Sequence, residues 1–358
     1  MPKVLILVAH RPQRSPSQRY RFEQYLPYLS QQGFEFTWSP LLNENDDVIF
    51  YSKGNFTKKI LILFKTVLIR LKDVQRFSGF DIIFIQREAL FLGSSYFEKK
   101  AKQSGKKVIF DFDDAIWLAD TSPGNKKWEW VKYPLKFNNN VSCATVVIAG
   151  NHYLAQKAEM FNKNVVVIPT TIDTEIHIPI PQERNKNVLT IGWSGSISTI
   201  KHFESLIPVL RKLKTEFGDR VRFAVYGDGQ YELKELNIRG LAWSADSEVM
   251  MLNSFDIGIM PLPEDAWTNG KCGLKALSYM ACEVPVVASA VGVNTGIIHH
   301  GKNGFLASSE EEWLYALKQL IQSTELRQTI GIEGRKTVIN AYSVKSQKAK
   351  YLEVFSKC

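Results

Sequence analysis

The chain has 358 residues, of which 45% are hydrophobic and 23% are charged, and its formal net charge is +9. This length exceeds what one small core usually supports, and it predicts two domains. The positive charge predicts anionic partners, such as a nucleotide or a lipid surface. Because no nucleic-acid-binding motif is present and aromatic residues are not interleaved with the basic runs, nucleic acid is not an expected partner.

Three features of the sequence bear on its location in the cell. No run approaches the roughly 18 apolar residues of a membrane-spanning helix, so no such helix is expected. The opening stretch MPKVLILVAHRPQRS has a short apolar run and no small-residue cleavage site, which predicts a β-strand rather than a signal peptide. The cysteines have no metal-binding or disulfide spacing and predict reduced thiols in a cytoplasmic protein; they are Cys143, Cys272, Cys282 and Cys358.

In the first half of the chain, short apolar runs alternate with amphipathic helices, which is typical of parallel α/β sheets. A helix closed by Gly33 is expected over 18–33. Continuous apolar runs favour strands that helices cover on both faces. These runs are 3–9, 80–86, 106–114, 144–150 and 164–170.

A polar, proline-containing stretch over 177–187 has the composition of an interdomain linker. A second α/β series follows it. Its expected strands are 188–196, 221–229, 255–262 and 284–289, and its expected helices are 200–218, 309–322 and 325–342. Since ligands of such sheets bind beyond the carboxyl ends of the strands, the candidate residues lie in the loops that follow them.

Asp111, Asp113 and Asp114 lie at the end of the strand predicted over 106–114. Three carboxylates repel one another unless they are protonated, metal-bound or hydrogen-bonded. Four interpretations stay open. The run is the nucleophile motif of an Asp-x-Asp phosphohydrolase, a metal clamp, a polar wall that binds sugar hydroxyls or acts as acid and base, or a cap for the next helix.

The stretch DAWTNGKCGLKALSYMACEVPVVAS (265–289) predicts a helix that begins near Asn269–Gly270 and ends before Pro285. Lys271 and Lys275 would then lie on one face of its first turns. Like charges at that spacing repel, and cations are disfavoured at a helix N-terminus. An anion is therefore expected beside them, unless both lysines are simply solvated.

The stretch GWSGSISTIK (192–201) predicts a strand, a loop of small residues and a helix. Backbone N–H groups of Gly195 and Ser196, together with the helix N-terminus and Lys201, would form a phosphate cradle. The alternative is an ordinary strand-to-helix turn.

Two basic segments belong to the first half of the chain. Arg19 and Arg21 are part of an arginine-rich stretch, 10–24, whose guanidinium groups suit phosphate or carboxylate unless the stretch is a basic surface loop. The stretch 56–77 has six basic residues and one acidic residue among long aliphatic runs. It predicts a basic amphipathic helix that lies on an anionic membrane or packs on the core with a basic outer face.

Three stretches carry a resemblance to a known family. VIPTTID (167–173), LKALSYMACEVPVVAS (274–289) and VGVNTGIIHHGKNGFLA (291–307) resemble the GT-B glycosyltransferases, specifically retaining family 4, and the resemblance runs over nearly the whole chain in order. It implies an α/β fold of two Rossmann-like domains that face a cleft. The implied acceptor-side domain is 1–178, the donor domain is 179–340, and the helix 341–358 packs back on the first domain.

The sequence departs from the family pattern in its second half. The usual pair of glutamates falls on Gly270 and Ser278, and the usual arginine is replaced around Trp193–Ser194. Lys271 and Lys275 stand instead. This combination is similar to a subgroup with a Gly-Lys-x3-Lys helix and an Asp-x-Asp-Asp strand end.

The resemblance implies a retaining glycosyltransferase of cell-surface polysaccharide synthesis, peripheral on the inner membrane face. Its expected partners are a nucleotide-diphosphate sugar, a glycan or lipid-linked acceptor and an anionic membrane surface, without metal or cofactor. A phosphohydrolase or a nucleotide-sugar epimerase is the alternative. Catalysis is assigned to Asp113 and Asp114, donor binding to Gly195, Ser196, Lys201, Lys271, Lys275 and Asn294, and acceptor binding to Arg19 and Arg21.

Overall fold

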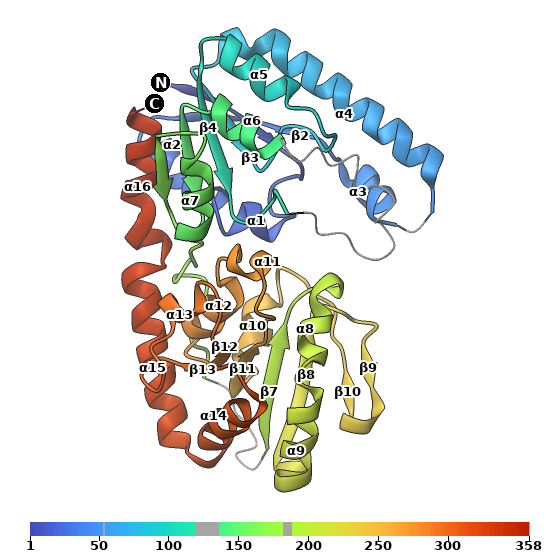
Figure 1. The fold of residues 1–358 in the computed structure, drawn as a ribbon, viewed down its shortest axis with the longest axis vertical. Coiled ribbons are helices and arrows are strands. Elements are labelled where there is room, and N and C mark those ends of the chain that lie inside the picture. The colour runs from blue at the N-terminus through green and yellow to red at the C-terminus, as the bar shows by residue number, and fades with distance from the viewer. Residues whose placement is uncertain (53, 119–135, 182–187, 358) are drawn as a thin grey trace. The chain divides into compact units, whose positions relative to one another are not determined.

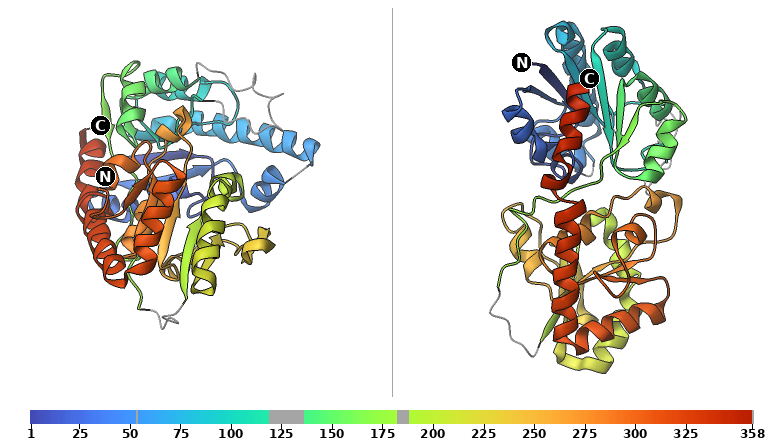
Figure 2. Two further views of the ribbon diagram at one scale, coloured as in Figure 1. Left: turned by 60° about the horizontal axis from the view of Figure 1, so that its bottom comes forward. Right: turned by 90° about the vertical axis from the view of Figure 1, so that its left-hand side faces the viewer.

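The computed structural model of the protein describes residues 1–52, 54–118, 136–181 and 188–357. Two compact units share the chain, and each contains a parallel sheet with helices packed against it (Figure 1, Figure 2). The predicted α/β class is therefore confirmed.

Neither unit is a single continuous segment. Unit 1 consists of Met1–Thr170, Gly270–Cys272 and Gln347–Cys358. Unit 2 consists of Thr171–Asn269 and Gly273–Ser346. Unit 1 thus ends its first segment before our predicted boundary at residue 178, and it takes in three residues from the middle of the second α/β series.

The sheet of unit 1 has six parallel strands in the order β2-β1-β3-β4-β5-β6. The strands are β1 Lys3–Val8, β2 Glu35–Pro40, β3 Ile82–Gln86, β4 Lys107–Phe112, β5 Val146–Ala149 and β6 Val165–Val167. The apolar runs predicted all of them except β2. This edge strand alternates between exposed and covered residues, so it has no continuous apolar run.

The helices of unit 1 pack on both faces of this sheet. They are α1 Pro16–Arg19, α2 Leu26–Gln31, α3 Glu44–Tyr51, α4 Phe56–Arg76, α5 Tyr96–Gln103, α6 Lys136–Cys143, α7 His152–Glu159 and, from Gln347 onward, α16 Val344–Lys357. The prediction of one helix over 18–33 is wrong, because α2 begins anew at Leu26 after a 3₁₀ turn. A proline in the first turn of α2 favours such a start, since it has no N–H to donate.

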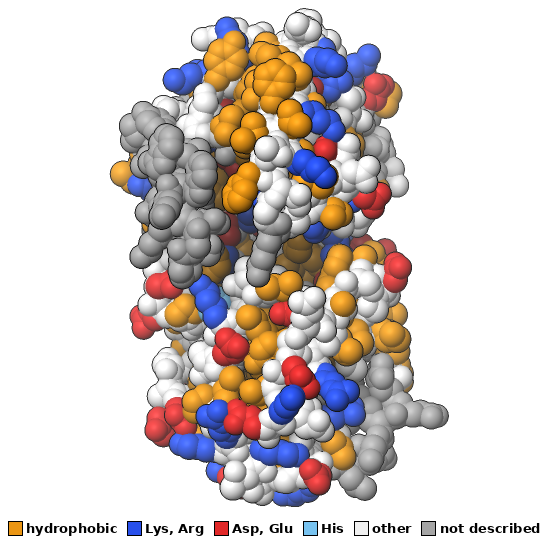
Figure 3. Space-filling view, turned by 90° about the vertical axis from the view of Figure 1, so that its right-hand side faces the viewer, with side chains coloured by type: hydrophobic (Ala, Val, Ile, Leu, Met, Phe, Trp, Pro, Cys, Tyr) orange, Lys and Arg blue, Asp and Glu red, His pale blue; other side chains and the backbone are white. Residues whose placement is uncertain are grey.

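Helix α4 has an unusual distribution of side chains. Its buried face includes the polar residues Thr66, Arg70 and Asp73. Its opposite face carries apolar side chains that are 39% to 70% exposed; they are Phe56, Ile60, Leu61, Phe64, Leu68 and Leu71, called here the α4 stripe. Figure 3 shows hydrophobic side chains gathered in its upper part with lysine and arginine side chains beside them.

The sheet of unit 2 has five parallel strands in the order β13-β12-β11-β7-β8. The strands are β7 Leu189–Ser194, β8 Val221–Tyr226, β11 Ile257–Met260, β12 Val286–Ser289 and β13 Phe305–Ala307, with a separate hairpin of β9 Glu232–Leu233 and β10 Ile238–Arg239. The helices are α8 Ile200–Glu204, α9 Ile207–Phe217, α10 Glu248–Asn253, α11 Ala266–Asn269, α12 Leu274–Ala281, α13 Asn294–Ile297, α14 Glu310–Gln322 and α15 Thr324–Ala341.

One prediction for the second α/β series is wrong, and another falls partly on residues that the structure does not describe. The single helix expected over 200–218 is two helices, and the second begins at Ile207 with Pro208 in its first turn. Part of the predicted linker, 182–187, lies outside the described residues. Among the helices that the structure describes, none is both long enough and apolar enough to cross a membrane.

Each sheet has a point at which the strand order reverses. In unit 1 this point lies between β1 and β3, and in unit 2 it lies between β7 and β11. Ligands of doubly wound sheets bind beyond the carboxyl ends of the strands at such a point. The loops that follow β1, β3 and β4 in unit 1, and β7 and β11 in unit 2, are therefore where functional side chains are expected.

Candidate active site

Four charged side chains meet where β3 and β4 end in unit 1. Arg87 Nε lies 2.8 Å from Asp113 Oδ1, and Lys271 Nζ lies 2.9 Å from Asp114 Oδ2. A second guanidinium nitrogen of Arg87 lies 3.7 Å from Asp114 Oδ2. These side chains, called here the charged quartet, are 12% to 34% exposed, so a ligand can reach groups that are already held in place.

The register of the sheet brings Arg87 to the two carboxylates. Gln86 of β3 pairs with Asp111 of β4, and the next backbone N–H, that of Arg87, donates to the Asp111 carbonyl at 2.7 Å. Arg87 adopts a left-handed conformation with a φ of 61°. That conformation costs a non-glycine residue on the order of 1 kcal/mol, and the contacts with Asp113 and Asp114 offset it.

Lys271 reaches the quartet because the segment Gly270–Cys272 packs within unit 1. Asn151 Nδ2 donates to the Lys271 carbonyl at 3.0 Å, and the Cys272 thiol donates to the Asp113 carbonyl at 3.2 Å. A Cβ at Gly270 would lie 2.6 Å from the Cβ of Ala115, so only glycine fits at this point.

The predicted helix that carries Lys271 and Lys275 on one face is therefore wrong. Helix α11 ends at Asn269, and α12 begins at Leu274 after Gly273, which has a left-handed φ of 73°. Lys271 lies between the two helices. The anion expected beside it is, in this structure, the carboxylate of Asp114.

Burial and ion pairing shift the pKa values of Lys271, Arg87 and Cys272. Burial lowers the pKa of Lys271, although the Asp114 carboxylate opposes the shift. It also disfavours the charge of Arg87, but Asp113 and Asp114 outweigh this effect and raise the pKa of the guanidinium. Burial raises the pKa of the Cys272 thiol to about 12, so Cys272 is a hydrogen-bond donor here and not a nucleophile.

Asp111 is separate from the quartet. Its carboxylate lies 2.6 Å from an Arg21 nitrogen, and both side chains are fully buried. Arg21 also donates to the Ile168 carbonyl. The prediction that Arg21 binds an acceptor at the surface is therefore wrong, and so is the phosphohydrolase pair, because Asp111 is sealed beneath an arginine. Arg19 is partly exposed and stacks on Tyr20, and its acceptor role stays a prediction.

The loop after β1 places three basic side chains around the buried carboxylate of Asp47. Arg14 Nε lies 2.5 Å from Asp47, His10 Nδ1 lies 3.7 Å from it and an Arg11 nitrogen lies 3.9 Å from it. Burial lowers the pKa of His10 to about 4, against the opposing effect of Asp47. His10 is therefore neutral at physiological pH.

In unit 2, the loop after β7 does not form the predicted phosphate cradle. The Gly195 N–H donates to the Tyr226 carbonyl at 2.9 Å, and the Ser196 N–H donates to Thr199 Oγ1 at 3.0 Å. Both N–H groups are engaged inside the protein, so the cradle as predicted is wrong. The Ser196 residue itself is exposed, as is Lys201 on α8.

The other predicted donor residues of unit 2 lie on α12 and α13. Lys275 Nζ lies 5.4 Å from the ring centroid of the buried Trp193. Asn294 is buried, and its amide nitrogen donates to the Ser289 carbonyl at 3.0 Å. Its amide oxygen has no hydrogen-bond partner among the described residues. A buried acceptor of this kind is expected to meet a donor from a ligand or a water.

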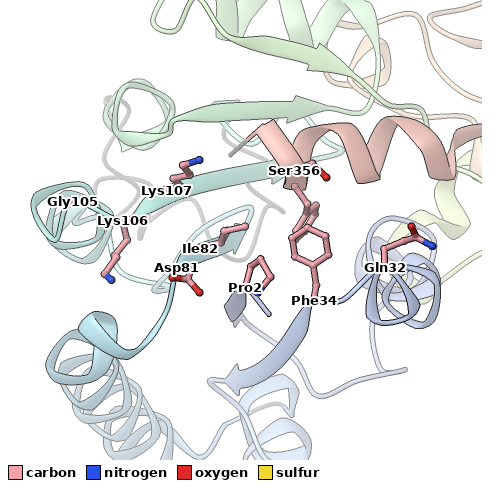
Figure 4. A pocket seen from close by; sticks show the side chains of 10 residues that line it. Pro2, Gln32, Phe34, Asp81, Ile82, Gly105, Lys106, Lys107 and Ser356 are labelled. Carbon is pink, nitrogen blue, oxygen red and sulfur yellow. The ribbon is translucent and has the colours of Figure 1, made fainter.

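The described part of the chain contains no group of three or more His, Cys, Asp or Glu side chains that could hold a metal ion, and metal-independent chemistry stays a prediction. A pocket of about 580 Å³ in unit 1 includes Phe34, Asp81 and Phe355 in its lining (Figure 4). It lies where β1, β3 and β4 begin, at the opposite edge of the sheet from the charged quartet.

Residues 188–323 match the family model described as "Glycosyl transferases group 1". This segment is a glycosyltransferase domain. It extends from β7 to α14 and includes Lys201, Lys271, Lys275 and Asn294. No curated protein gives a significant match to the chain.

Solved structures similar to this chain cover its whole length. Anabaena Alr3699/HepE, in complex with UDP and glucose, has a TM-score of 0.71 and 15% identity, with 100% of both chains covered. Sucrose-phosphate synthase from Thermosynechococcus elongatus has a TM-score of 0.71 and 14% identity, covering 100% of this chain and 98% of that one. A glycosyltransferase from Rickettsia africae has a TM-score of 0.69 and 17% identity, covering 99% and 97%. These likenesses show the GT-B fold.

Proposed function

We propose that the protein transfers a sugar from a nucleotide-diphosphate sugar to a glycan or lipid-linked acceptor, with retention of configuration at the anomeric carbon. The glycosyltransferase domain at 188–323 is the observation that carries this proposal. The complexes of neighbours support it: HepE was solved with UDP-glucose, and a TarM variant from S. aureus was solved with UDP and α-GlcNAc-glycerol.

On the donor side, the chemical problem is the departure of a diphosphate from the anomeric carbon. Positive charge held in place where the leaving group gains negative charge lowers that barrier. We assign this role to Lys201 and Lys275, with the Ser196 hydroxyl as a further donor. The unpartnered Asn294 oxygen would accept a hydrogen bond from the donor sugar or its nucleotide.

On the acceptor side, we assign Asp113 and Asp114 to hydrogen bonds with sugar hydroxyls. Arg87 and Lys271 hold both side chains in place through ion pairs of 2.8 and 2.9 Å. Hydrogen bonds to charged groups contribute about 1.5–3 kcal/mol each. A carboxylate already engaged by a guanidinium is a poor nucleophile, so a donor phosphate oxygen would take the acceptor proton as the hydroxyl attacks from the same face.

We further propose that this reaction serves cell-surface polysaccharide synthesis at the inner face of the membrane and needs no metal ion. In this proposal Lys201 and Lys275, rather than a metal ion, would offset the charge of the diphosphate. Activity that survives excess EDTA is the expected result. Activity that is lost and then restored by Mg²⁺ or Mn²⁺ would overturn this part of the proposal.

A thermal-shift panel of nucleoside diphosphates and nucleotide sugars tests the donor. A specific donor present at about 100 times its dissociation constant should stabilise the folded protein by about 2.7 kcal/mol. The donor found is then incubated with acceptor extracts, and the anomeric configuration of the product is read by NMR. Sugar released or epimerised without an acceptor would indicate a hydrolase or an epimerase instead, and a panel without any stabilising nucleotide would contradict the donor class.

A further inference from the structure

We propose that the α4 stripe docks on an anionic membrane surface, and that docking presents the strand ends of unit 1 to a lipid-linked acceptor. The first part stands on helix α4 alone, and the second rests on the proposed transferase function. The side chains of the stripe are markedly exposed: Ile60, Leu61 and Phe64 are 65%, 68% and 63% exposed. On the neighbouring α3, Val48 and Tyr51 are 70% and 58% exposed.

Packing within unit 1 does not explain this apolar face. A surface helix normally turns its apolar side to the core and its polar side to water. In α4 the polar residues Thr66, Arg70 and Asp73 are buried. Within the apolar run 60–64, Ile62 packs in the core, whereas Ile60, Leu61 and Phe64 are exposed. A contiguous exposed patch of this kind marks a site of interaction with a protein or a membrane.

The charges along α4 indicate which partner covers the stripe. Lys58, Lys65 and Lys72 recur every seven residues, so they form one exposed row beside the stripe. The sole acidic residue of α4, Asp73, is buried and pairs with Arg70 and Arg76. Of the row, Lys65 also contacts Asp46 of α3 at 2.5 Å.

An anionic bilayer satisfies both features of the helix at once. Apolar side chains enter the boundary between headgroups and acyl chains, while long lysine side chains reach the anionic headgroups. A second copy of the chain would bring two lysine rows together, and like charges oppose that contact. We therefore assign the stripe to a lipid surface rather than to self-association.

Arg70 connects the docking face to the candidate active site. From the buried face of α4 it donates to the carbonyls of Val8 at 2.9 Å, Ser39 at 2.9 Å and Ala89 at 2.6 Å. Val8 and Ser39 lie at the ends of β1 and β2, and Ala89 follows Arg87 of the charged quartet. A helix with its side chains is about 10–12 Å across. The strand ends therefore lie about one helix width from the lipid headgroups, within reach of a membrane-embedded acceptor.

Co-sedimentation of the full-length protein with vesicles tests the proposal. Wild type should bind vesicles of phosphatidylglycerol and phosphatidylcholine at low salt, bind pure phosphatidylcholine at least ten-fold less, and dissociate at high salt. A stripe variant (Ile60→Asn, Phe64→Asn, Leu68→Asn) and a row variant (Lys58→Gln, Lys65→Gln, Lys72→Gln) should each lose at least ten-fold of the binding.

Matched controls come from unit 2. Ile332 and Ile339 on α15 are 45% and 42% exposed, and their replacement by Asn should leave vesicle binding unchanged. Replacement of the exposed Lys234, Lys302 and Lys336 by Gln should do the same. Circular dichroism and thermal unfolding show whether each variant is folded.

Three outcomes would overturn the proposal. They are a wild type that stays in the supernatant at low salt, a stripe variant that binds as well as wild type, and a wild-type dimer in analytical ultracentrifugation that the stripe variant abolishes. Transfer to a soluble acceptor without vesicle binding would remove this inference and leave the transferase in place. Vesicle binding without any sugar transfer would remove the proposed transferase and leave the membrane docking in place.

Discussion

Lys271 belongs to Gly270–Cys272, the segment of the second α/β series that packs within unit 1. The change Lys271→Ala removes the ammonium group that lies 2.9 Å from Asp114 and leaves the Arg87 nitrogen at 3.7 Å. We expect kcat/KM for transfer to fall at least ten-fold, because Asp114 then loses the partner that fixes its orientation. Steady-state kinetics of the purified variant measures the loss.

A double-mutant cycle with Asp114→Asn gives the matched control. Two side chains that act through each other should show a coupling energy of about 1 kcal/mol or more in kcat/KM. Strictly additive losses, or a Lys271→Ala variant as active as wild type, would mean that the ion pair is only structural.

Protonation of His10 should lower the free energy of unfolding in acid. Burial lowers its pKa to about 4 from an ordinary value of 6.5. Between these values the unfolded chain binds more protons than the folded one, so stability falls as the pH falls. Between pH 7 and about pH 5 this one group removes about 2 kcal/mol of unfolding free energy.

Urea unfolding of wild type and His10→Gln at the two pH values measures that loss. The variant should lose about 2 kcal/mol less than wild type on acidification. Equal responses of wild type and His10→Gln would contradict the assignment to His10.

The residues of the candidate site differ in how far the sequence can predict them. Asp113 and Asp114 stand out because consecutive carboxylates at a strand end are costly without a partner. Their partners do not stand out, because Lys271 contacts Asp114 across 157 residues and Arg21 contacts Asp111 across 90. Arg87 could have been found, since it follows a strand that pairs with β4, but only once the strand order was known.

Helix α4 depends on one buried ion pair for its attachment to the sheet. Arg70→Met leaves Asp73 buried without its main partner and removes the hydrogen bonds that Arg70 donates to three carbonyl groups. Breaking a buried pair in this way costs about 3–5 kcal/mol. Urea unfolding of the variant should show a loss of that size.

Arg76 provides a close comparison, because it contacts the same carboxylate from the surface. It lies 2.7 Å from Asp73 but is 46% exposed. An exposed pair contributes about 1 kcal/mol or less, so Arg76→Met should have a small effect. Equal losses in the two variants would contradict the anchoring role of Arg70.

At the scale of elements, apolar periodicity predicts what is buried on both sides and fails where a local conformation decides. The continuous apolar runs of β1, β3 and β4 identify these strands, whereas the half-exposed β2 has no such run and is not predicted. The helix expected to begin near Asn269–Gly270 begins only at Leu274, because Gly273 takes a left-handed φ and separates α11 from α12. The pattern of α4 predicts its helix correctly, but it does not reveal that Arg70 and Asp73 are buried while Ile60, Leu61 and Phe64 are exposed.

At the scale of the whole molecule, α16 completes the core of unit 1. Phe355 is 2% exposed, and its ring lies 5.6 to 6.0 Å from the rings of Phe34, Phe36 and Phe84. Phe355→Ala should destabilise unit 1 by about 3–5 kcal/mol through the lost contacts and the cavity. Hydrogen exchange should therefore accelerate in β1 and β3 and stay unchanged in β11 and β12.

The reverse experiment uses a phenylalanine of the other core. Phe217 is 5% exposed in unit 2, and Phe217→Ala should accelerate exchange in β7 and β8 while sparing β1 and β3. Acceleration in both units with either variant would show that the two units unfold together.

The three-segment composition of unit 1 has a consequence for synthesis on the ribosome. At about 5–20 residues per second, roughly 10–40 s separate the emergence of residue 170 from that of residue 358. Throughout that interval the first segment lacks Tyr351 and Phe355, which close its core. Unit 2, in contrast, has all its residues once Ser346 has emerged. The half of the protein that is translated first is therefore the half that finishes folding last, and during the wait its unfilled core is the surface that a chaperone would meet.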